Sequence, residues 1–366
     1  MTAPPALTLR AVRATPVDVP MRHVLGTSQA AVRSAPLVLI DLETEEGVTG
    51  RAYLFCYLPA AAGAIIALLA EVERQVKGAR VAPVDLWAKL AKRFTLIGVQ
   101  GIVRMAMAGL DVACWDALAL AANVPLATML GAAPRRVRAY NSNGLGLMAT
   151  GPLADEAQSL VEEGGFTAVK LRLGYPTLEE DLAAVDAVRE RVGERVQVMV
   201  DYNQALTVAE ALRRGHALDG LGLAWIEEPI RHDDYRGCAE LAAALATPVQ
   251  IGENFSGATA MQSALEANAS DYVMPDLERI GGVTGWQRAA GLAAARGIET
   301  STHLFPEVSA HLLAATPTAH WLEYVDWAAP LLEQPLEVVE GFAVVPERPG
   351  NGLAWNREAV ERYRMR

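Results

Sequence analysis

The second half of the chain alternates short apolar runs with amphipathic segments, and this pattern constrains the fold more than any other feature. From about Arg136 onward, runs of strand length are separated by segments that carry apolar residues at helical spacing. Eight such units in succession are typical of a closed parallel barrel. We therefore predict an α/β fold with a TIM-like (β/α) barrel over residues 133–340, whose strands lie in VRAYNS, AVKLRL, VQVMVDYN, LAWIEEP, VQIGEN, YVMPDL, IETSTHL and WLEYVD.

The first 132 residues follow another pattern, in which strands come first and helices follow. LTLRAVRATPVDVP and APLVLIDLETEEGVTGRAYLF are strand-like, and Glu45, Glu46 and Gly47 interrupt the second run as a hairpin turn does. A helical pattern then runs through IVRMAMAGLDVACWDALALAA. We predict an N-terminal α+β capping domain over residues 1–132, and we expect the segment 341–366 to leave the barrel and pack back on that domain.

The charge and the cysteines restrict partners and compartment. A formal net charge of -11 and a pI near 5.1 argue against a general affinity for nucleic acid or for anionic membrane surfaces. No apolar run reaches the roughly 18 residues that a membrane span requires. Cys56, Cys114 and Cys238 show neither metal-ligand spacing nor a disulfide pattern, and the first residues do not read as a leader, so we expect a cytoplasmic protein.

Polar residues end each predicted barrel strand, which is where catalytic groups lie in such barrels. Asp201, Glu227 and Glu253 end consecutive strands and are expected to face one opening. Taken singly, each carboxylate could instead cap the following helix. Together, their negative charges in a low-dielectric site need a cation, and a hard divalent ion such as Mg²⁺ prefers oxygen ligands. We predict a magnesium site at these residues.

Further candidate catalytic groups occupy other strand ends. Asp276 and His303 end neighbouring strands, so the aspartate could fix one imidazole nitrogen and make the other a base. Lys170 and Arg172 share one face of a strand, where they either bind an anion or pair with surface acids. Glu323 could donate a hydrogen bond to a substrate oxygen if burial raises its pKa.

These groups together favour one class of reaction. Removing the proton next to a carboxylate produces a carbanion, which is inaccessible unless its charge is delocalised into an enediolate held by a metal, a cation and an acid. A barrel that has lost catalysis is the alternative. The expected signature of such a loss is a missing metal carboxylate, whereas all three are present.

From about Val17 to its end, the chain resembles the enolase superfamily and, within it, the mandelate racemase subgroup. The resemblance is strongest in VMVDYNQ, WIEEP, MPDLERIGGVTGW and EVSAHLLAATPTAHWLE. It implies a Mg²⁺-dependent isomerase or lyase that acts on a small 2-hydroxy carboxylate and forms a homo-oligomer, with an octamer expected. It also implies that Asp201, Glu227 and Glu253 bind the metal.

The resemblance further implies roles around the substrate. His303 with Asp276 resembles the base for one substrate face, Glu323 the acid that hydrogen-bonds the substrate carboxylate, and Lys170 a substrate contact. The first domain would close over the barrel mouth and select the side chain. The other positions implied to lie around the substrate are Ser142, Asn203, Tyr57, Leu25 and Val32.

One position departs from the pattern of this family. The second position of the Lys-x-Lys pair, which serves the other substrate face in mandelate racemase, is Arg172 here. In water, a guanidinium costs roughly 9 kcal/mol to neutralise at pH 7, against roughly 5 kcal/mol for an ammonium, and it binds carboxylates well. The whole-chain resemblance favours a 2-hydroxyacid racemase. The alternative is a sugar-acid dehydratase, which needs only the His303 side.

The loop MRHVLGTSQAAVR bears on substrate size. Leu25 and Val32 predict an apolar wall. The polar residues of the loop would suit a polyhydroxy acid if they faced inward, or they face solvent as loop residues usually do: Arg22, His23, Gln29 and Arg33.

Overall fold

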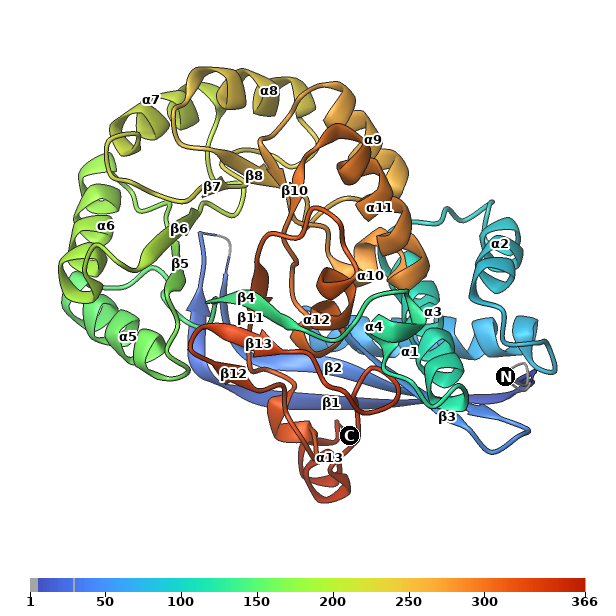
Figure 1. Cartoon of the computed structure of the whole chain (residues 1–366). Helices are drawn as coiled ribbons and strands as arrows, with labels where there is room; N and C mark the ends of the chain where they lie inside the picture. The colour runs from blue at the N-terminus through green and yellow to red at the C-terminus, as the bar shows by residue number, and fades with distance from the viewer. Residues whose placement is uncertain (1–5, 29, 366) are drawn as a thin grey trace.

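The computed structural model describes residues 6–28 and 30–365, and its larger part is a closed parallel barrel (Figure 1). Neighbouring strands pair from β4 to β10, and β11 pairs with β4. The ring closes where the backbone N–H of Thr302 donates to Trp321 O at 2.9 Å. The predicted (β/α) barrel is confirmed. Its strands are β4 (Arg136–Asn141), β5 (Ala168–Arg172), β6 (Gln197–Asp201), β7 (Ile226–Glu227), β8 (Val249–Ile251), β9 (Tyr272–Val273), β10 (Glu299–Thr300) and β11 (Leu322–Tyr324).

Helices follow the barrel strands, and many of them cover the outside of the ring (Figure 1). α6 begins with a capping box, in which the Thr177 hydroxyl accepts from the Glu180 N–H and the Glu180 carboxylate accepts from the Thr177 N–H. Thr207 and Asp234 cap two further helices with their side chains. The helices of this part are α5 (Thr150–Glu162), α6 (Leu178–Val192), α7 (Val208–Leu218), α8 (Tyr235–Ala244), α9 (Ala258–Glu266), α10 (Leu277–Ile280), α11 (Gly282–Arg296) and α12 (Pro306–Ala314).

The first domain is an antiparallel sheet with helices packed on it, as predicted for an α+β cap. Its sheet contains β1 (Leu9–Gly26), β2 (Ala31–Thr44) and β3 (Thr49–Phe55), and its helices are α1 (Pro59–Val76), α2 (Pro83–Arg93), α3 (Gly101–Ala121) and α4 (Leu126–Met129). α3 is largely buried because it also meets the barrel, where buried Asp111 accepts the backbone N–H of Thr284 at 2.9 Å.

The C-terminal part first returns to the barrel and then crosses to the first domain. β13 (Phe342–Val344) pairs with the short β12 (Val338–Val339) and runs antiparallel to β4. η1 (Ala329–Leu331) precedes these strands. α13 (Arg357–Tyr363) then reaches β1, where the Met365 N–H donates to Pro16 O at 3.0 Å. The structure therefore places the start of segment 341–366 on the barrel and its end on the first domain.

The hairpin of β1 and β2 extends to the barrel opening (Figure 1). The Leu147 N–H donates to Gly26 O at 2.9 Å, and the Ser28 hydroxyl donates to Tyr202 O at 3.1 Å. A Cβ on Gly146 would collide with the backbone of Gly26, so this close approach requires glycine. The first domain thus covers the carboxyl ends of the barrel strands.

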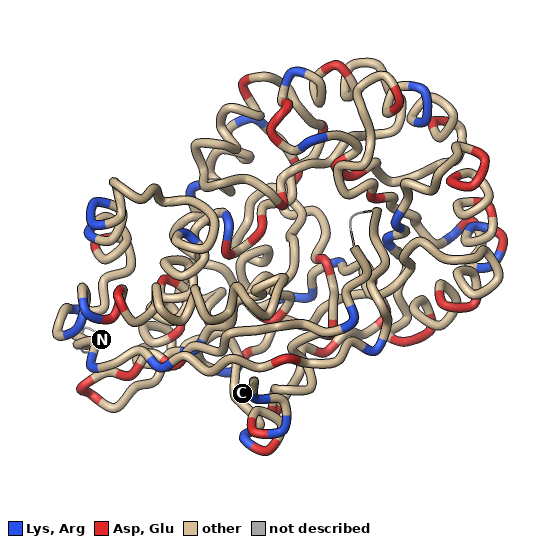
Figure 2. Tube along the Cα trace, turned by 180° about the vertical axis from the view of Figure 1, so that it is seen from behind, with Lys and Arg blue, Asp and Glu red and all other residues tan. Residues whose placement is uncertain are grey.

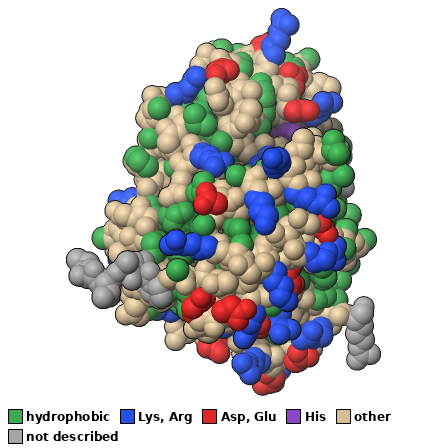
Figure 3. Space-filling view, turned by 90° about the vertical axis from the view of Figure 1, so that its right-hand side faces the viewer, with side chains coloured by type: hydrophobic (Ala, Val, Ile, Leu, Met, Phe, Trp, Pro, Cys, Tyr) green, Lys and Arg blue, Asp and Glu red, His purple; other side chains and the backbone are tan. Residues whose placement is uncertain are grey.

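Charged residues occur on both the outer helices and the inner segments of the ring. Acidic and basic residues are interspersed along the outer helices, and some lie on the inner segments (Figure 2). Lys and Arg side chains are spread over the face that carries α2 (Figure 3). Within the described residues, no helix is long and apolar enough to cross a membrane.

Candidate active site

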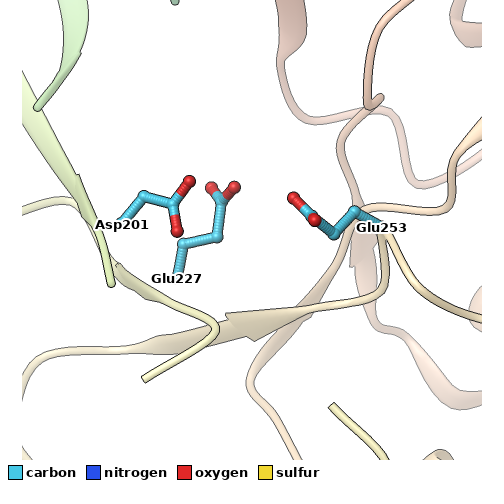
Figure 4. A group of neighbouring side chains, drawn as sticks. All are labelled: Asp201, Glu227 and Glu253. Carbon is cyan, nitrogen blue, oxygen red and sulfur yellow. The ribbon is translucent and has the colours of Figure 1, made fainter. Parts of the chain in front are cut away.

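The predicted magnesium ligands lie together at the mouth of the barrel. Asp201 ends β6, Glu227 ends β7, and Glu253 follows β8. One carboxylate oxygen of each lies within 4.8 Å of the others, and the side chains point toward a common space (Figure 4). Hard oxygen donors that converge in this way, two of them buried, fit Mg²⁺.

Lys170 lies next to this cluster of three carboxylates. Its Nζ is 2.5 Å from Glu227 Oε1, 2.8 Å from Glu323 Oε1 and 3.6 Å from Asp201 Oδ2. Burial opposes the charged form of Lys170, but Glu227 and Glu323 outweigh burial and raise its pKa well above the ordinary value. Lys170 is therefore a buried cation, and the alternative of pairing with surface acids is excluded for it.

The charge of Glu227 is not fully compensated by Lys170. Burial raises the pKa of Glu227 to about 8 despite Lys170, and the neighbouring carboxylates of Asp201, Glu323 and Glu253 add to the increase. Part of the negative charge therefore lacks a counter-ion, which is the electrostatic condition that a divalent metal removes.

His303 and Asp276 form the predicted pair. Asp276 Oδ1 accepts the backbone N–H groups of Glu278 at 2.8 Å and Arg279 at 2.9 Å, so Asp276 caps α10. Its Oδ2 lies 2.7 Å from His303 Nδ1. A carboxylate only accepts, so Nδ1 donates, and Nε2 lies 3.3 Å from Glu253. Burial lowers the pKa of His303, but Glu253 and other carboxylates raise it to about 9.

The condition under which Glu323 would act as an acid, a pKa raised by burial, is not met in this structure. Burial does favour the neutral acid, but Lys170 and His303 and the Leu304 N–H, 2.8 Å from Oε2, lower the pKa below its usual range. The Ser142 hydroxyl also donates to Oε1 at 2.7 Å. In this structure Glu323 is a carboxylate that accepts hydrogen bonds, because it is surrounded by donors.

Arg172 is buried at the end of β5, and its guanidinium is held in place by oxygen acceptors. Its Nη1 donates to the carbonyl oxygens of Ser142 at 2.9 Å and of Gly144 and Lys170 at 3.3 Å. Nη2 donates to the Ser142 hydroxyl at 2.9 Å. The Nε–H is buried and has no hydrogen-bond partner among the described residues. Arg172 therefore offers the site a fixed hydrogen-bond donor.

A cavity of about 320 Å³ lies between these groups and the first domain. Its polar side includes Asn203, whose Nδ2 donates to Asp201 Oδ2 at 3.1 Å, whereas Glu227, Asp276 and Ser142 lie behind the wall. The strand-end residues that line it are Lys170, Arg172, Asp201, Glu253, His303 and Glu323. Leu25 and Val32 line it from the hairpin, as predicted. The other apolar or aromatic residues of its wall are Ala30, Phe55, Tyr57, Leu304 and Trp327.

The polar residues of the hairpin are engaged elsewhere. Arg22 pairs with Glu163 at 2.6 Å and with Asp326 at 3.0 Å. His23 Nδ1 lies 3.2 Å from Glu156 Oε1. Arg33 is exposed, and the prediction for Gln29 lies outside the described residues. Of the two alternatives for this loop, the described residues therefore support the apolar wall.

The sequence did not point to Arg279, Phe55 and Trp327, which also line the cavity. Arg279 Nη1 donates to Glu253 O at 3.2 Å and to Asn254 Oδ1 at 2.6 Å, and its guanidinium lies 4.6 Å from the centre of the Tyr57 ring. The sequence feature that could have indicated Arg279 is its position one helical turn after Asp276, an aspartate at the end of a strand. The aromatic residues carried no signal, because their strands and loops are far apart in sequence.

Strained backbone surrounds the cavity. Positive φ angles occur at Tyr57 (60°), Asn203 (48°), Gln204 (64°) and Leu304 (52°), all of which line it. Residues other than glycine seldom adopt this conformation, and such outliers gather where the surrounding structure fixes functional groups. The strain supports this cavity as the functional site.

The fold and the site define a metal-dependent barrel enzyme with a capping domain. Family comparison places it more closely: residues 152–359 match the enolase C-terminal domain-like family, and residues 10–131 match the mandelate racemase / muconate lactonizing enzyme N-terminal domain. The chain belongs to the enolase superfamily and is a magnesium-dependent enzyme, which confirms the resemblance seen in the sequence.

Relatives of known structure and of known activity cover nearly the whole chain. A Bradyrhizobium enolase, crystallised with magnesium and mandelic acid, is 39% identical with a TM-score of 0.95 and covers 100% of both chains. L-talarate/galactarate dehydratase of Salmonella typhimurium is 34% identical over 94% of this chain and 86% of its own length. D-galactarolactone cycloisomerase of Agrobacterium fabrum is 30% identical over 90% of this chain and 91% of its own.

Proposed function

We propose that the enzyme removes the α-proton of a 2-hydroxy carboxylate from one face only, with His303 as its base, and eliminates a β-hydroxyl group as water. The observation that carries this proposal is Arg172. It stands where a second base would stand, and its four hydrogen bonds to oxygen acceptors hold it as a donor. A dehydratase needs no base at that position, whereas a racemase does.

The side chains around the cavity have different roles in the proposed reaction. Asp201, Glu227 and Glu253 would hold Mg²⁺, which would supply positive charge next to the substrate carboxylate. Lys170 donates to the substrate carboxylate, and the free Nε–H of Arg172 donates to a second substrate oxygen. Glu323 keeps Lys170 and Ser142 in place through contacts of 2.8 Å and 2.7 Å.

The proton balance involves a single imidazole. Glu253 makes the largest contribution that raises the pKa of His303, and a cation bound at Glu253 would offset it and leave the imidazole neutral. Nε2 of the neutral imidazole then accepts the α-proton as the C2–H bond breaks, and the electron pair moves into the enediolate. The C3–O bond then breaks, and the leaving hydroxyl takes the proton from Nε2 and departs as water. The resulting enol tautomerises to a 2-keto-3-deoxy acid. Asp276 keeps Nδ1 protonated through both steps.

The named relatives support this class of reaction. The Salmonella protein is a dehydratase, and an arabinonate dehydratase of Saccharolobus solfataricus is 28% identical over 94% of this chain. The apolar hairpin wall at Leu25 and Val32 suits a substrate with fewer distal hydroxyl groups than a hexarate.

Racemisation of an apolar 2-hydroxy acid is the second candidate. The apolar wall of the cavity favours it, as does the mandelic acid in the structure of the Bradyrhizobium relative. This reaction requires that Arg172, or a group near it, exchange a proton with the second face of the substrate.

The two candidates are separated by one experiment. The Mg²⁺-loaded protein is incubated in D₂O with each enantiomer of mandelate and with a panel of sugar acids, and α-proton exchange and products are followed by NMR. We expect a 2-keto-3-deoxy product from a sugar acid, or exchange of one mandelate enantiomer without inversion. Exchange with inversion would overturn the one-base proposal in favour of the racemase.

We also propose that the enzyme assembles as a homo-oligomer, with an octamer as the expected state. Light scattering coupled to size-exclusion chromatography measures this directly, and a monomer at micromolar concentration would contradict it.

A further inference from the structure

A second cavity, of about 300 Å³, lies beside the active-site cavity. The two cavities share Tyr57, Asn254 and Arg279 in their walls. The second cavity adds Arg104 from α3 and Ser256 from the loop before α9. It therefore brings together two guanidinium groups that are far apart in the sequence.

Arg104 has no counter-ion among the residues that the structure describes, and its Nε is buried without a hydrogen-bond partner. Its guanidinium lies 5.7 Å from the centre of the Trp87 ring. A Cβ on Gly257 would be 2.6 Å from Nη1, so the backbone there comes close to the guanidinium. Burial lowers the pKa of Arg104. An unpaired cation in this position is costly unless an anion reaches it.

Other groups of the cavity also favour an anion. The Tyr57 hydroxyl is buried and, within the described residues, has no hydrogen-bond partner. Gly101, the first residue of α3, lines the cavity, and the first turn of this helix has neither an acidic residue nor a side-chain cap. The positive end of the helix dipole is therefore not neutralised by the chain.

We propose that this second cavity is an oxyanion-binding site that takes a carboxylate or a similar small oxyanion through Arg104, the Tyr57 hydroxyl and the start of α3. Arg279 connects it to the metal site, because Nη1 of Arg279 donates to the backbone oxygen of Glu253 at 3.2 Å. The oxyanion is either a second carboxylate of a substrate held in the active-site cavity or a separate small anion. The site stands independently of which reaction the enzyme catalyses.

The first test uses free anions. The Mg²⁺-loaded protein is titrated with sulfate and with acetate by calorimetry, in the wild type, in Arg104→Gln and in Arg362→Gln. Arg362 is an exposed arginine that pairs with Glu358 on α13. Arg362→Gln is therefore the control: it removes the same charge as Arg104→Gln, but at a place far from the cavity. If a separate anion fills the site, Arg104→Gln weakens binding about tenfold or more, and Arg362→Gln leaves it unchanged.

The second test asks whether the bound oxyanion is a carboxylate group of the substrate. If the site holds a second carboxylate, Arg104→Gln raises KM for a 2-hydroxy dicarboxylate about tenfold, with little change in kcat and no change for the monocarboxylate of equal length. Arg104→Lys keeps the charge, so it should show a smaller loss of anion binding or a smaller rise in KM than Arg104→Gln. If Arg104→Gln does not fold, Arg104→Lys is measured in its place. Binding and KM that are unchanged in the Arg104 variant used would overturn the proposal.

Discussion

Replacing Asp276 by Asn should remove the base function of His303 while leaving the fold in place. Oδ1 of Asp276 accepts the N–H groups of Glu278 at 2.8 Å and Arg279 at 2.9 Å, so the amide oxygen of the variant will occupy that position. The amide N–H₂ group must then face His303 Nδ1, which lies 2.7 Å from Oδ2. Nδ1 can then only accept, and the imidazole proton moves to Nε2, the nitrogen that has to take the α-proton.

The expected loss of activity is large because Nε2 of His303 carries a proton in the wrong tautomer and has no lone pair to accept the α-proton. General base catalysis contributes about 10²- to 10⁴-fold, and a wrong tautomer in a serine-protease triad costs about 10⁴-fold. We expect α-proton exchange to fall about 10³-fold, which corresponds to roughly 4 kcal/mol. The cap of α10 is preserved in Asp276→Asn, so the free energy of unfolding should change by less than about 1 kcal/mol.

The assay is the rate of α-proton exchange in D₂O at saturating Mg²⁺, with the position of the imidazole proton read from ¹⁵N shifts. Asp234→Asn is the matched control, because Asp234 caps α8 by accepting the Gly237 N–H at 2.9 Å. This control should keep the wild-type rate. An Asp276→Asn rate within tenfold of wild type, or an unchanged tautomer, would refute the reasoning.

Three further predictions concern the metal and the second face of the substrate. Glu227→Gln should weaken Mg²⁺ binding at least about 100-fold and abolish turnover, and calorimetry that shows unchanged affinity would contradict the ligand assignment. Burial and the neighbouring carboxylates raise the pKa of Glu227 to about 8, so a proton must leave before the metal binds. Affinity for Mg²⁺ should therefore rise about tenfold per pH unit from pH 6 toward 8 and then level off, whereas a flat profile counts against this titration. Arg172→Lys should create exchange at the second face of a 2-hydroxy acid if the site is arranged as in a racemase; NMR that shows no inversion favours the one-base site.

The barrel and the convergence of its three carboxylates were predictable because both follow from local patterns. Apolar runs and amphipathic segments specify parallel strands and their helices, and parallel strands bring their carboxyl ends to one edge. Asp201, Glu227 and Glu253 therefore had to meet once the strands were identified. The pairing of Asp276 with His303 follows in the same way from two neighbouring strands.

The protonation of Glu323 and the direction of the hairpin side chains were not predictable. Glu323 is ionised because Lys170, at 2.8 Å, and the Leu304 N–H lie beside it, and these groups come from different parts of the chain. Arg22 turns away from the cavity because Glu163 and Asp326 pair with it. Burial alone predicts the opposite pKa shift for Glu323, since it accounts for desolvation but not for the neighbouring charge.

The sequence by itself thus determined the barrel, the cap, the carboxylates of the candidate metal site and the arginine that replaces a lysine, since periodicity and residue identity are properties of the chain. Only the tertiary structure decided how the charges are balanced: Lys170 is surrounded by carboxylates, Arg172 is fixed by carbonyl oxygens, and Arg104 lacks a counter-ion within the described residues. The physical reason is that an electrostatic energy depends on the distance between groups and on their exposure to water, and both are set when distant segments pack together.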